Sequence, residues 1–197
     1  MLRIEPARLH DLPGAYRVCL RTGDAGEDAT TRIDDPDLLG HVYVGPYITR
    51  GVGTQLVAVD EHGVAGYLLS ADDTLALEAW AEAEWWPPLR ARYPSVTGAP
   101  MDVELIRLIH SPERTPADLA TEFPAHLHID LLEHARGQGL GRRLIGRLLD
   151  DLRARGIPGV HLGVDAANTN GIGFYEHLGF REVAREPGGL IMGLRFG

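Results

Sequence analysis

The chain of 197 residues contains no lysine and only one cysteine, Cys19. A single cysteine cannot form an internal disulfide, which is typical of proteins in a reducing compartment, so we expect a cytoplasmic protein. No run of residues approaches the roughly 20 apolar positions that a membrane span needs, and the first residues, MLRIEPARLHDL, carry charges where a signal peptide would be apolar. We therefore expect no membrane association.

The chain also has little positive charge, with a formal net charge of −9. Nucleic acids and anionic lipids require a basic surface, so both are disfavoured as partners. All 19 basic residues are arginine, and six of them fall between Arg136 and Arg155. A locally basic segment in an acidic chain favours a small anionic ligand, because guanidinium groups suit bidentate contacts to phosphate.

The second half of the chain alternates strands and helices. Glycine turns and helical or alternating apolar spacing predict, in order, strand Leu127–Leu132, helix Leu140–Arg155, strand Gly159–Val164, helix Thr169–Leu178, strand Phe180–Ala184 and strand Leu190–Leu194. This region predicts a compact α/β unit.

The first half is less regular. Its pattern predicts strand Leu2–Ile4, helix Leu9–Leu20, an exposed loop at Gly23–Thr30, a helix start at Asp34–Pro36, irregular chain at Val42–Ile48, a hairpin of Thr54–Asp60 and Val64–Ser70, helix Thr74–Tyr93 capped by Asp72 or Asp73 and interrupted at Pro87-Pro88, a buried strand at Val103–Ile109, and a short helix at Ala117–Phe123. The whole predicts one α+β domain, residues 1–197, built on a mixed sheet.

A glycine-rich turn joins the strand at 127–132 to the helix that follows it, and reads Arg136-Gly137-Gln138-Gly139-Leu140-Gly141-Arg142. The first N–H groups of a helix have no partners within the helix, and glycines let a ligand approach them closely, so the turn predicts a diphosphate site. A nucleotide P-loop would need a lysine. A dinucleotide-binding loop would need a glycine at 142, where the chain has arginine.

The spacing Arg136-x-x-Gly139-x-Gly141 resembles the coenzyme A signature of the GNAT acetyltransferases. A second segment, from Asn168 through Tyr175 to Leu178-Gly179-Phe180, is similar to the second motif of that family, and the two stand in the family's order. The resemblance implies a GNAT fold: a mixed, mostly antiparallel sheet, helices on both faces, and a splay between the fourth and fifth strands. It also implies acetyl-CoA as cosubstrate.

The same resemblance implies which residues bind the coenzyme. The pantetheine arm would pair with main-chain groups of Leu131 and Leu132, the diphosphate would lie on the turn before the helix with Arg136 or Arg142 nearby, and Asn168 would contact the arm. The implied set is Leu131, Leu132, Arg136, Gly137, Gln138, Gly139, Leu140, Gly141, Arg142, Asn168 and Tyr175. Residues 125–185 would form this acetyl-CoA-binding core, and residues 1–124 the acceptor side.

The first half also resembles the C-terminal acetyltransferase-like domain of eukaryotic O-GlcNAcase, in the segments Arg21–Thr30, Asp35-Pro36 and Tyr43–Tyr47. In this family the acceptor pocket forms in that region, which implies substrate-binding roles for Asp24, Asp28, Tyr43 and Tyr47. Acidic groups there would attract a cationic amine. A loop of solvated carboxylates explains Asp24 and Asp28 equally well.

Acyl transfer to an amine needs a group that protonates the departing thiolate and a group that receives the amine proton. The resemblance implies that Tyr175 is the acid; the alternative is a core tyrosine. Alternation places His126, His128 and Asp130 on one face of their strand, where they are costly unless partnered. Asp130, or else His128, is the candidate base, and a structural hydrogen-bonded pair is the alternative.

These observations favour an acetyl-CoA-dependent N-acetyltransferase that acts directly on a small-molecule or peptide amine. The alternative is a non-catalytic acetyl-CoA-binding or protein-interaction module. No spacing of histidines and carboxylates predicts a metal site. A homodimer is compatible with the sequence, which does not identify the acceptor.

Overall fold

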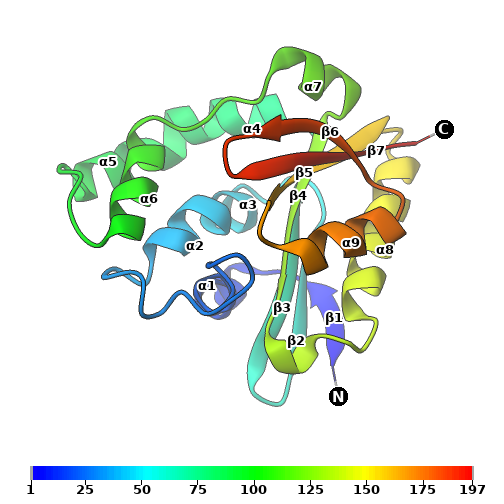
Figure 1. Cartoon of the computed structure of the whole chain (residues 1–197), viewed down its shortest axis with the longest axis horizontal. Coiled ribbons are helices and arrows are strands. Elements are labelled where there is room, and N and C mark those ends of the chain that lie inside the picture. Colours follow the sequence, from blue (N-terminus) through cyan, green and yellow to red (C-terminus); the bar gives the residue numbers. More distant parts are fainter. Residues whose placement is uncertain (1, 197) are drawn as a thin grey trace.

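The computed structural model describes residues 2–196 and builds them around one seven-stranded sheet (Figure 1). The strands are β1 (Arg3–Pro6), β2 (Gln55–Asp60), β3 (Gly63–Ala71), β4 (Ala125–Leu131), β5 (Gly159–Asp165), β6 (Arg181–Glu186) and β7 (Gly189–Arg195). Their order across the sheet is β1-β2-β3-β4-β5-β7-β6. The pair β4 and β5 is parallel and the other pairs are antiparallel, which confirms the mixed, mostly antiparallel sheet.

Helices cover both faces of the sheet. They are α1 (Leu12–Leu20), α2 (Leu38–Tyr43), α3 (Gly45–Arg50), α4 (Thr74–Trp80), α5 (Trp86–Arg92), α6 (Pro100–His110), α7 (Ala117–Glu122), α8 (Leu140–Ala154) and α9 (Thr169–His177). Short 3₁₀ turns lie at Leu9–Asp11 and Glu133–Ala135, and a π-helical segment, Ala81–Trp85, joins α4 to α5. Each helix within residues 2–196 is too short or too polar to span a lipid bilayer.

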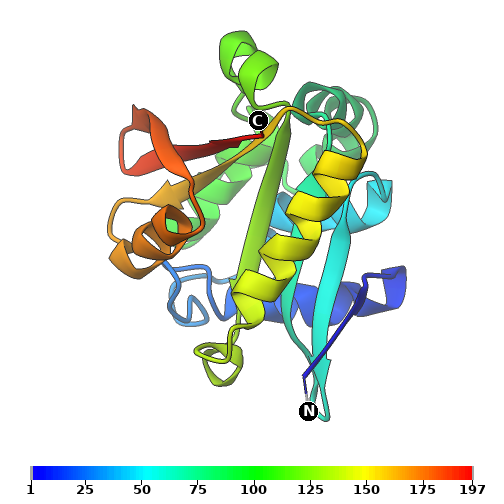
Figure 2. The same cartoon turned by 90° about the vertical axis from the view of Figure 1, so that its right-hand side faces the viewer.

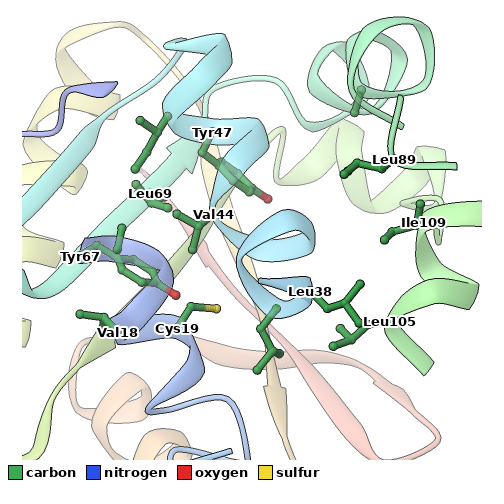
Figure 3. Close-up of a cluster of buried hydrophobic side chains, with 14 of the residues drawn as sticks. Val18, Cys19, Leu38, Val44, Tyr47, Tyr67, Leu69, Leu89, Leu105 and Ile109 are labelled. Atoms are coloured by element: carbon green, nitrogen blue, oxygen red, sulfur yellow. The ribbon is translucent and has the colours of Figure 1, made fainter. Parts of the chain in front are cut away.

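Two hydrophobic cores result, one on each face. The first packs helices α1 to α6 against residues of β2 and β3 such as Val57 and Tyr67, and Figure 3 shows part of it. The second core packs α8 against Leu56 and Leu68, the sequence neighbours of Val57 and Tyr67 on the same two strands. Figure 2 shows α8 crossing that face. Because side chains alternate along a strand, adjacent residues of the hairpin feed opposite cores.

The sequence predictions for the elements of the second half hold to within one or two residues, and the hairpin and the helix at 117–122 are also confirmed. The predicted long helix at 74–93 is capped by Asp73, whose carboxylate accepts a hydrogen bond from the Ala76 N–H at 2.9 Å. It is interrupted before Pro87 by the π-helical segment, and α5 then starts with its prolines in the first turn, where proline is tolerated.

The helix expected to start at Asp34–Pro36 starts at Leu38 instead, after Asp37. Two further local predictions are wrong in the type of structure. Val103–Ile109 is not a strand but most of α6, and its buried residues Asp102, Leu105, Ile106 and Ile109 follow helical spacing. The run of apolar residues there fits both periods, and only packing against α2 and α5 decides between them.

The second error concerns Val42–Ile48, predicted to be irregular. This segment contains the end of α2 and the start of α3, and Pro46 lies in the first turn of α3. Gly45-Pro46 therefore begins a helix instead of interrupting one, because the missing N–H of a proline costs nothing at that position.

Candidate functional site

The sheet opens between β4 and β5. The two strands pair only at Ala125 with Val160 and at His126 with His161, and beyond these residues no pairing continues. The remainder of β4, from Leu127 to Leu131, therefore has an open edge on the side of β5. This is the splay that the family resemblance implied between the fourth and fifth strands.

Main-chain groups of alternate residues face this opening. The Leu132 N–H donates to the Ala65 carbonyl oxygen of β3 at 2.9 Å, and the antiparallel register places Asp130 and His128 in the same orientation. The N–H and C=O groups of Ile129 and Leu131 consequently point the other way, toward the opening. Of the two residues proposed to pair with a pantetheine arm, Leu131 lies at the opening, whereas the Leu132 N–H is already bonded.

Helix α8 begins beside the open edge with a set of unpaired N–H groups. Among residues 2–196, none of the N–H groups of residues 137 to 142 donates to an acceptor within the chain. Gly139 precedes the helix with φ of 71°. Residues other than glycine adopt this backbone conformation at a cost of about 1–2 kcal/mol. The site therefore presents bare amides and the positive end of a helix dipole.

Gly141 sets how closely α8 approaches α9. A Cβ at this position would lie 3.1 Å from Phe174 Cζ, so any side chain there displaces the residue next to Tyr175. We predict that Gly141→Val lowers affinity for coenzyme A about tenfold or more, since it disturbs both helices at the opening. Gly146→Val is the matched control, because a Cβ at Gly146 meets nothing within 4 Å. Calorimetry measures both, and equal affinities in the two variants would contradict the prediction.

The two arginines of the turn have different environments. Arg136 Nε donates to the Leu131 carbonyl oxygen at 2.8 Å, and its Nη2 donates to the Gly26 carbonyl oxygen at 2.6 Å. Arg136 therefore ties the Gly23–Thr30 loop to the end of β4. Arg142 is exposed in the first turn of α8 and forms no ion pair within the described chain, so its guanidinium is available to an anion.

Asn168, like Arg136, lies beside Gly26. Its Oδ1 caps α9 by accepting the Gly171 N–H at 2.8 Å, while its amide nitrogen faces Gly26. The opening is thus bounded by the end of β4, the Gly23–Thr30 loop and the start of α9.

Tyr175 projects from α9 between Phe174 and Phe180, with ring centroids 5.4 and 5.8 Å away. Within the described residues its hydroxyl has no hydrogen-bond partner, and the side chain is half-buried. Burial, and then the nearby charge of Asp130, raise the pKa of Tyr175 above its ordinary value. The hydroxyl therefore keeps its proton throughout the neutral range and is close enough to Asp130 to sense its charge.

Asp130 is half-buried near the end of β4 and accepts a hydrogen bond from the Tyr67 hydroxyl. In Figure 3 that hydroxyl also points toward Cys19, which lies buried on α1. Burial raises the pKa of Asp130 to about 6, and the hydrogen bond from Tyr67 opposes the rise. At pH 7 the group is mostly ionised, and it is a stronger proton acceptor than an ordinary aspartate.

On the same face of β4, two histidines belong to a hydrogen-bonded chain. The Thr74 Oγ1 lies 2.8 Å from the Pro124 carbonyl oxygen and 2.8 Å from His126 Nδ1. The Tyr47 hydroxyl joins His126 Nε2 to His128 Nε2, the latter at 2.9 Å. Burial lowers the pKa of both histidines, that of His128 to about 4, so both rings are neutral at pH 7.

The donor of each hydrogen bond in this series can be assigned by starting from the Pro124 carbonyl oxygen. A carbonyl oxygen can only accept, so Thr74 donates to Pro124 and must accept from His126 Nδ1–H. His126 Nε2 then accepts from the Tyr47 hydroxyl, and the Tyr47 oxygen accepts from His128 Nε2–H. His128 Nδ1 is left with a free lone pair.

Tyr47→Phe should interrupt the series of hydrogen bonds that connects His126 to His128. We predict a loss of about 1–3 kcal/mol of stability, because His126 Nε2 would lose its donor in a buried site. Urea unfolding measures the loss. Tyr93→Phe is the control, since its hydroxyl donates to Asp35 at 2.8 Å and accepts from Arg92 Nε at 3.2 Å in a more open position. The side-chain ¹⁵N spectrum should show His128 as the Nε2–H tautomer in the wild type and a mixture in the variant. An unchanged tautomer would refute the assignment.

A cavity of about 210 Å³ adjoins the histidines. His126, His128 and His161 form one side of it, and Tyr43 and Tyr47 are among the other lining residues. Tyr43 and Tyr47 therefore line the same cavity as the histidines of β4. No group of histidine, cysteine or carboxylate side chains within residues 2–196 could hold a metal ion.

Asp24 and Asp28 lie elsewhere, in the Gly23–Thr30 loop. Asp24 pairs with Arg32. Asp28 accepts hydrogen bonds from the Thr30 hydroxyl and from the Thr30 N–H, the latter at 2.9 Å, and both bonds lower the pKa of Asp28. Asp28 lines a separate cavity of about 520 Å³ together with Arg136. The structure does not bring these two carboxylates to the tyrosines.

Several residues of the site have no signal in the sequence. In the sequence, Thr74 marks only the start of a helix and Tyr67 is only a residue of the hairpin. His161 belongs to a buried strand, and Trp86 has the pattern of a helix residue that packs in the core. Their roles depend on contacts between segments far apart in the chain. Only the polar residues of β4 could be found by their alternation.

Comparison with known proteins bears on this geometry. Residues 78–180 match the model of the acetyltransferase (GNAT) family. The chain is 25% identical over 189 residues to protein O-GlcNAcase of Rattus norvegicus, an alignment that covers 94% of this chain and 20% of that protein. The chain thus corresponds to about a fifth of that relative's length.

Solved structures agree with the sequence matches. The crystal structure of SsHAT is 34% identical and covers 98% of this chain and of its own, with a TM-score of 0.90. A protein from Salmonella typhimurium, solved with its cofactor acetyl-CoA, has the same fold at 18% identity and a TM-score of 0.57, covering 99% of this chain and 94% of its own.

Proposed function

The chain belongs to the acetyltransferase (GNAT) family, and on this basis we propose that it transfers the acetyl group of acetyl-CoA to an amine. The observation that carries the proposal is the set of unpaired N–H groups at residues 137 to 142, directly beside the open edge of β4. One site thus offers a place for a diphosphate and, next to it, main-chain groups for an extended amide-bearing arm.

The residues present fit this cosubstrate. Gly137, Gln138, Gly139, Leu140, Gly141 and Arg142 would hold the diphosphate, with the exposed guanidinium of Arg142 as its counter-charge. The main-chain groups of Ile129 and the N–H of Leu131 would pair with the arm, and the Asn168 amide would lie beside it. Acetyl-CoA supplies the activated acyl group. Arg136 would act indirectly, because its bonds hold the Gly23–Thr30 loop against this opening.

The chain's own groups divide the proton transfers. Asp130, with a pKa of about 6, receives the proton of the acceptor amine, directly or through a water molecule. His128 presents a neutral lone pair beside it and orients the amine. Tyr175 retains its proton at neutral pH and donates it to the departing thiolate. Asp130 is preferred to His128 as base because its pKa is closer to the working pH.

Calorimetric titration with coenzyme A tests the binding part of this proposal. We expect a dissociation constant between about 1 µM and 1 mM, the usual range of enzyme substrates, and no competition by ATP or NAD. Thiol release with a panel of amines tests turnover. No measurable affinity for coenzyme A at millimolar concentration would refute the proposal, and binding without turnover of any amine would favour the non-catalytic module.

A further inference from the structure

Aromatic side chains and aliphatic groups together line the cavity beside His128. The six aromatic side chains are those of Tyr43, Tyr47, Trp86, His126, His128 and His161, and aliphatic groups such as Leu77, Ala81 and Leu108 contribute much of the rest. Aromatic faces pack best against other flat rings. The volume of about 210 Å³ favours a ligand with a small body.

Two of the histidines that line this cavity, His128 and His161, each keep one nitrogen lone pair. The His161 Nδ1–H donates to the Phe123 carbonyl oxygen at 2.8 Å, which leaves Nε2 as an acceptor, and the chain through Tyr47 leaves His128 Nδ1 as an acceptor. Neither atom bonds within residues 2–196, and neither is fully buried, since His41 Nε2 is the one buried unpaired side-chain atom of that range. The cavity therefore offers acceptors to a ligand that carries N–H or O–H groups.

The cavity offers no free cation to an anionic ligand. Arg114 is the only guanidinium that lines it, and this group is held by Glu78 at 3.9 Å and by Glu82 at 3.4 Å. The other charged lining residues, Glu78 and Glu113, are acidic. A carboxylate placed among these rings would lose its hydration without gaining a partner.

We infer that the cavity binds the acyl acceptor, and that this acceptor is a primary amine on a compact, uncharged aromatic body without a carboxylate. The amine end lies at His128, one alternation along β4 from Asp130, and the ring lies among Tyr43, Trp86 and His161. This inference rests on the proposed function for the reaction, but the binding of the amine depends only on the cavity.

Calorimetry on the protein without coenzyme tests the inference with three probes: phenethylamine, phenylalanine, which adds a carboxylate to the same body, and 1,4-diaminobutane, which lacks the ring. We expect phenethylamine to bind about tenfold more tightly, or better, than either of the others, because only it matches an apolar cavity with no free cation. The imidazole ¹⁵N signals of His128 and His161 should shift with it.

Ala81→Phe should locate the binding. Ala81 is 4% exposed and lines the cavity, so a phenyl ring there fills the space and should abolish phenethylamine binding. Ala79→Phe, at an exposed position on the same helical stretch, should leave it unchanged. If Ala81→Phe fails to fold, the shifts of His128 and His161 in the wild-type protein decide the matter.

A parallel titration with coenzyme A keeps the two proposals separate. If coenzyme A binds while phenethylamine does not, the inference about the acceptor is wrong and the proposed function stands. If phenethylamine binds and coenzyme A does not, the reverse holds. Preference for phenylalanine, for 1,4-diaminobutane or for a lysine-containing peptide would overturn the inference about the acceptor.

Discussion

Replacing Asp130 by asparagine is expected to lower kcat/KM by about 10²–10³-fold, the usual contribution of a positioned base. Asparagine has the same shape and can still accept the hydrogen bond from Tyr67, so the fold should persist. The wild-type rate should rise with pH and level off above about pH 6, where the carboxyl has ionised. The pH–rate profile of the variant should lack this rising limb. The measurement is thiol release across the pH range, with amine and acetyl-CoA at low concentration.

Tyr67→Phe also tests the assignment of Asp130 as the base, because Tyr67 donates the hydrogen bond that Asp130 accepts. The Tyr67 hydroxyl stabilises the ionised form of Asp130 and so lowers its pKa, and removing the hydroxyl should move the limb to higher pH. A merely structural role for Tyr67 would lower activity without moving the limb. A pH profile that is identical in the wild type and the Asp130→Asn variant would transfer the role of base to His128 or to the free substrate.

Replacing Tyr175 by phenylalanine is expected to reduce kcat by about 10²-fold or more, because the departing thiolate would lose its proton donor. Affinity for coenzyme A should stay within about twofold of the wild-type value, since the ring and its packing against Phe174 and Phe180 remain. An interaction made only during the reaction changes kcat and leaves binding almost intact. Steady-state kinetics and calorimetry together give both values.

Tyr16→Phe is the matched control for Tyr175→Phe. Its hydroxyl bonds to His41 Nδ1 at 3.0 Å, far along the chain from the splay, and its loss should leave turnover unchanged. If Tyr175→Phe retained full turnover, solvent would be the proton source, and Tyr175 would be a packing residue of α9. A large loss of coenzyme affinity would likewise contradict the assignment, because it would show a role in binding.

The sequence was most informative where function depends on the main chain of a short segment. The glycine spacing from Arg136 to Gly141 predicts a helix start with accessible amides because glycine conformation and helix ends are local properties. The polar alternation of His126, His128 and Asp130 similarly predicts a shared strand face. Both features are present in the structure.

The sequence was least informative where a segment fits both helical and strand periodicity, or where a side chain has two alternative contact partners. The segment Val103–Ile109 carries an apolar run that suits a strand or a helix, and the contacts of α6 with α2 and α5 select the helix. Asp24 and Asp28 stand near Tyr43 in the chain, yet the loop bonds to itself and to Arg136, while Tyr43 and Tyr47 turn toward β4.

The amino-acid sequence by itself determined the family resemblance, the helix start beside the splay and the polar face of β4, because each lies within one contiguous segment. Only the tertiary structure decided the proton order from Pro124 through Tyr47 to His128, the raised pKa of Asp130 and the cavity beside His128. These depend on burial and on contacts such as the one between Tyr47 and His128, 81 positions apart in the chain, and neither can be read from local spacing.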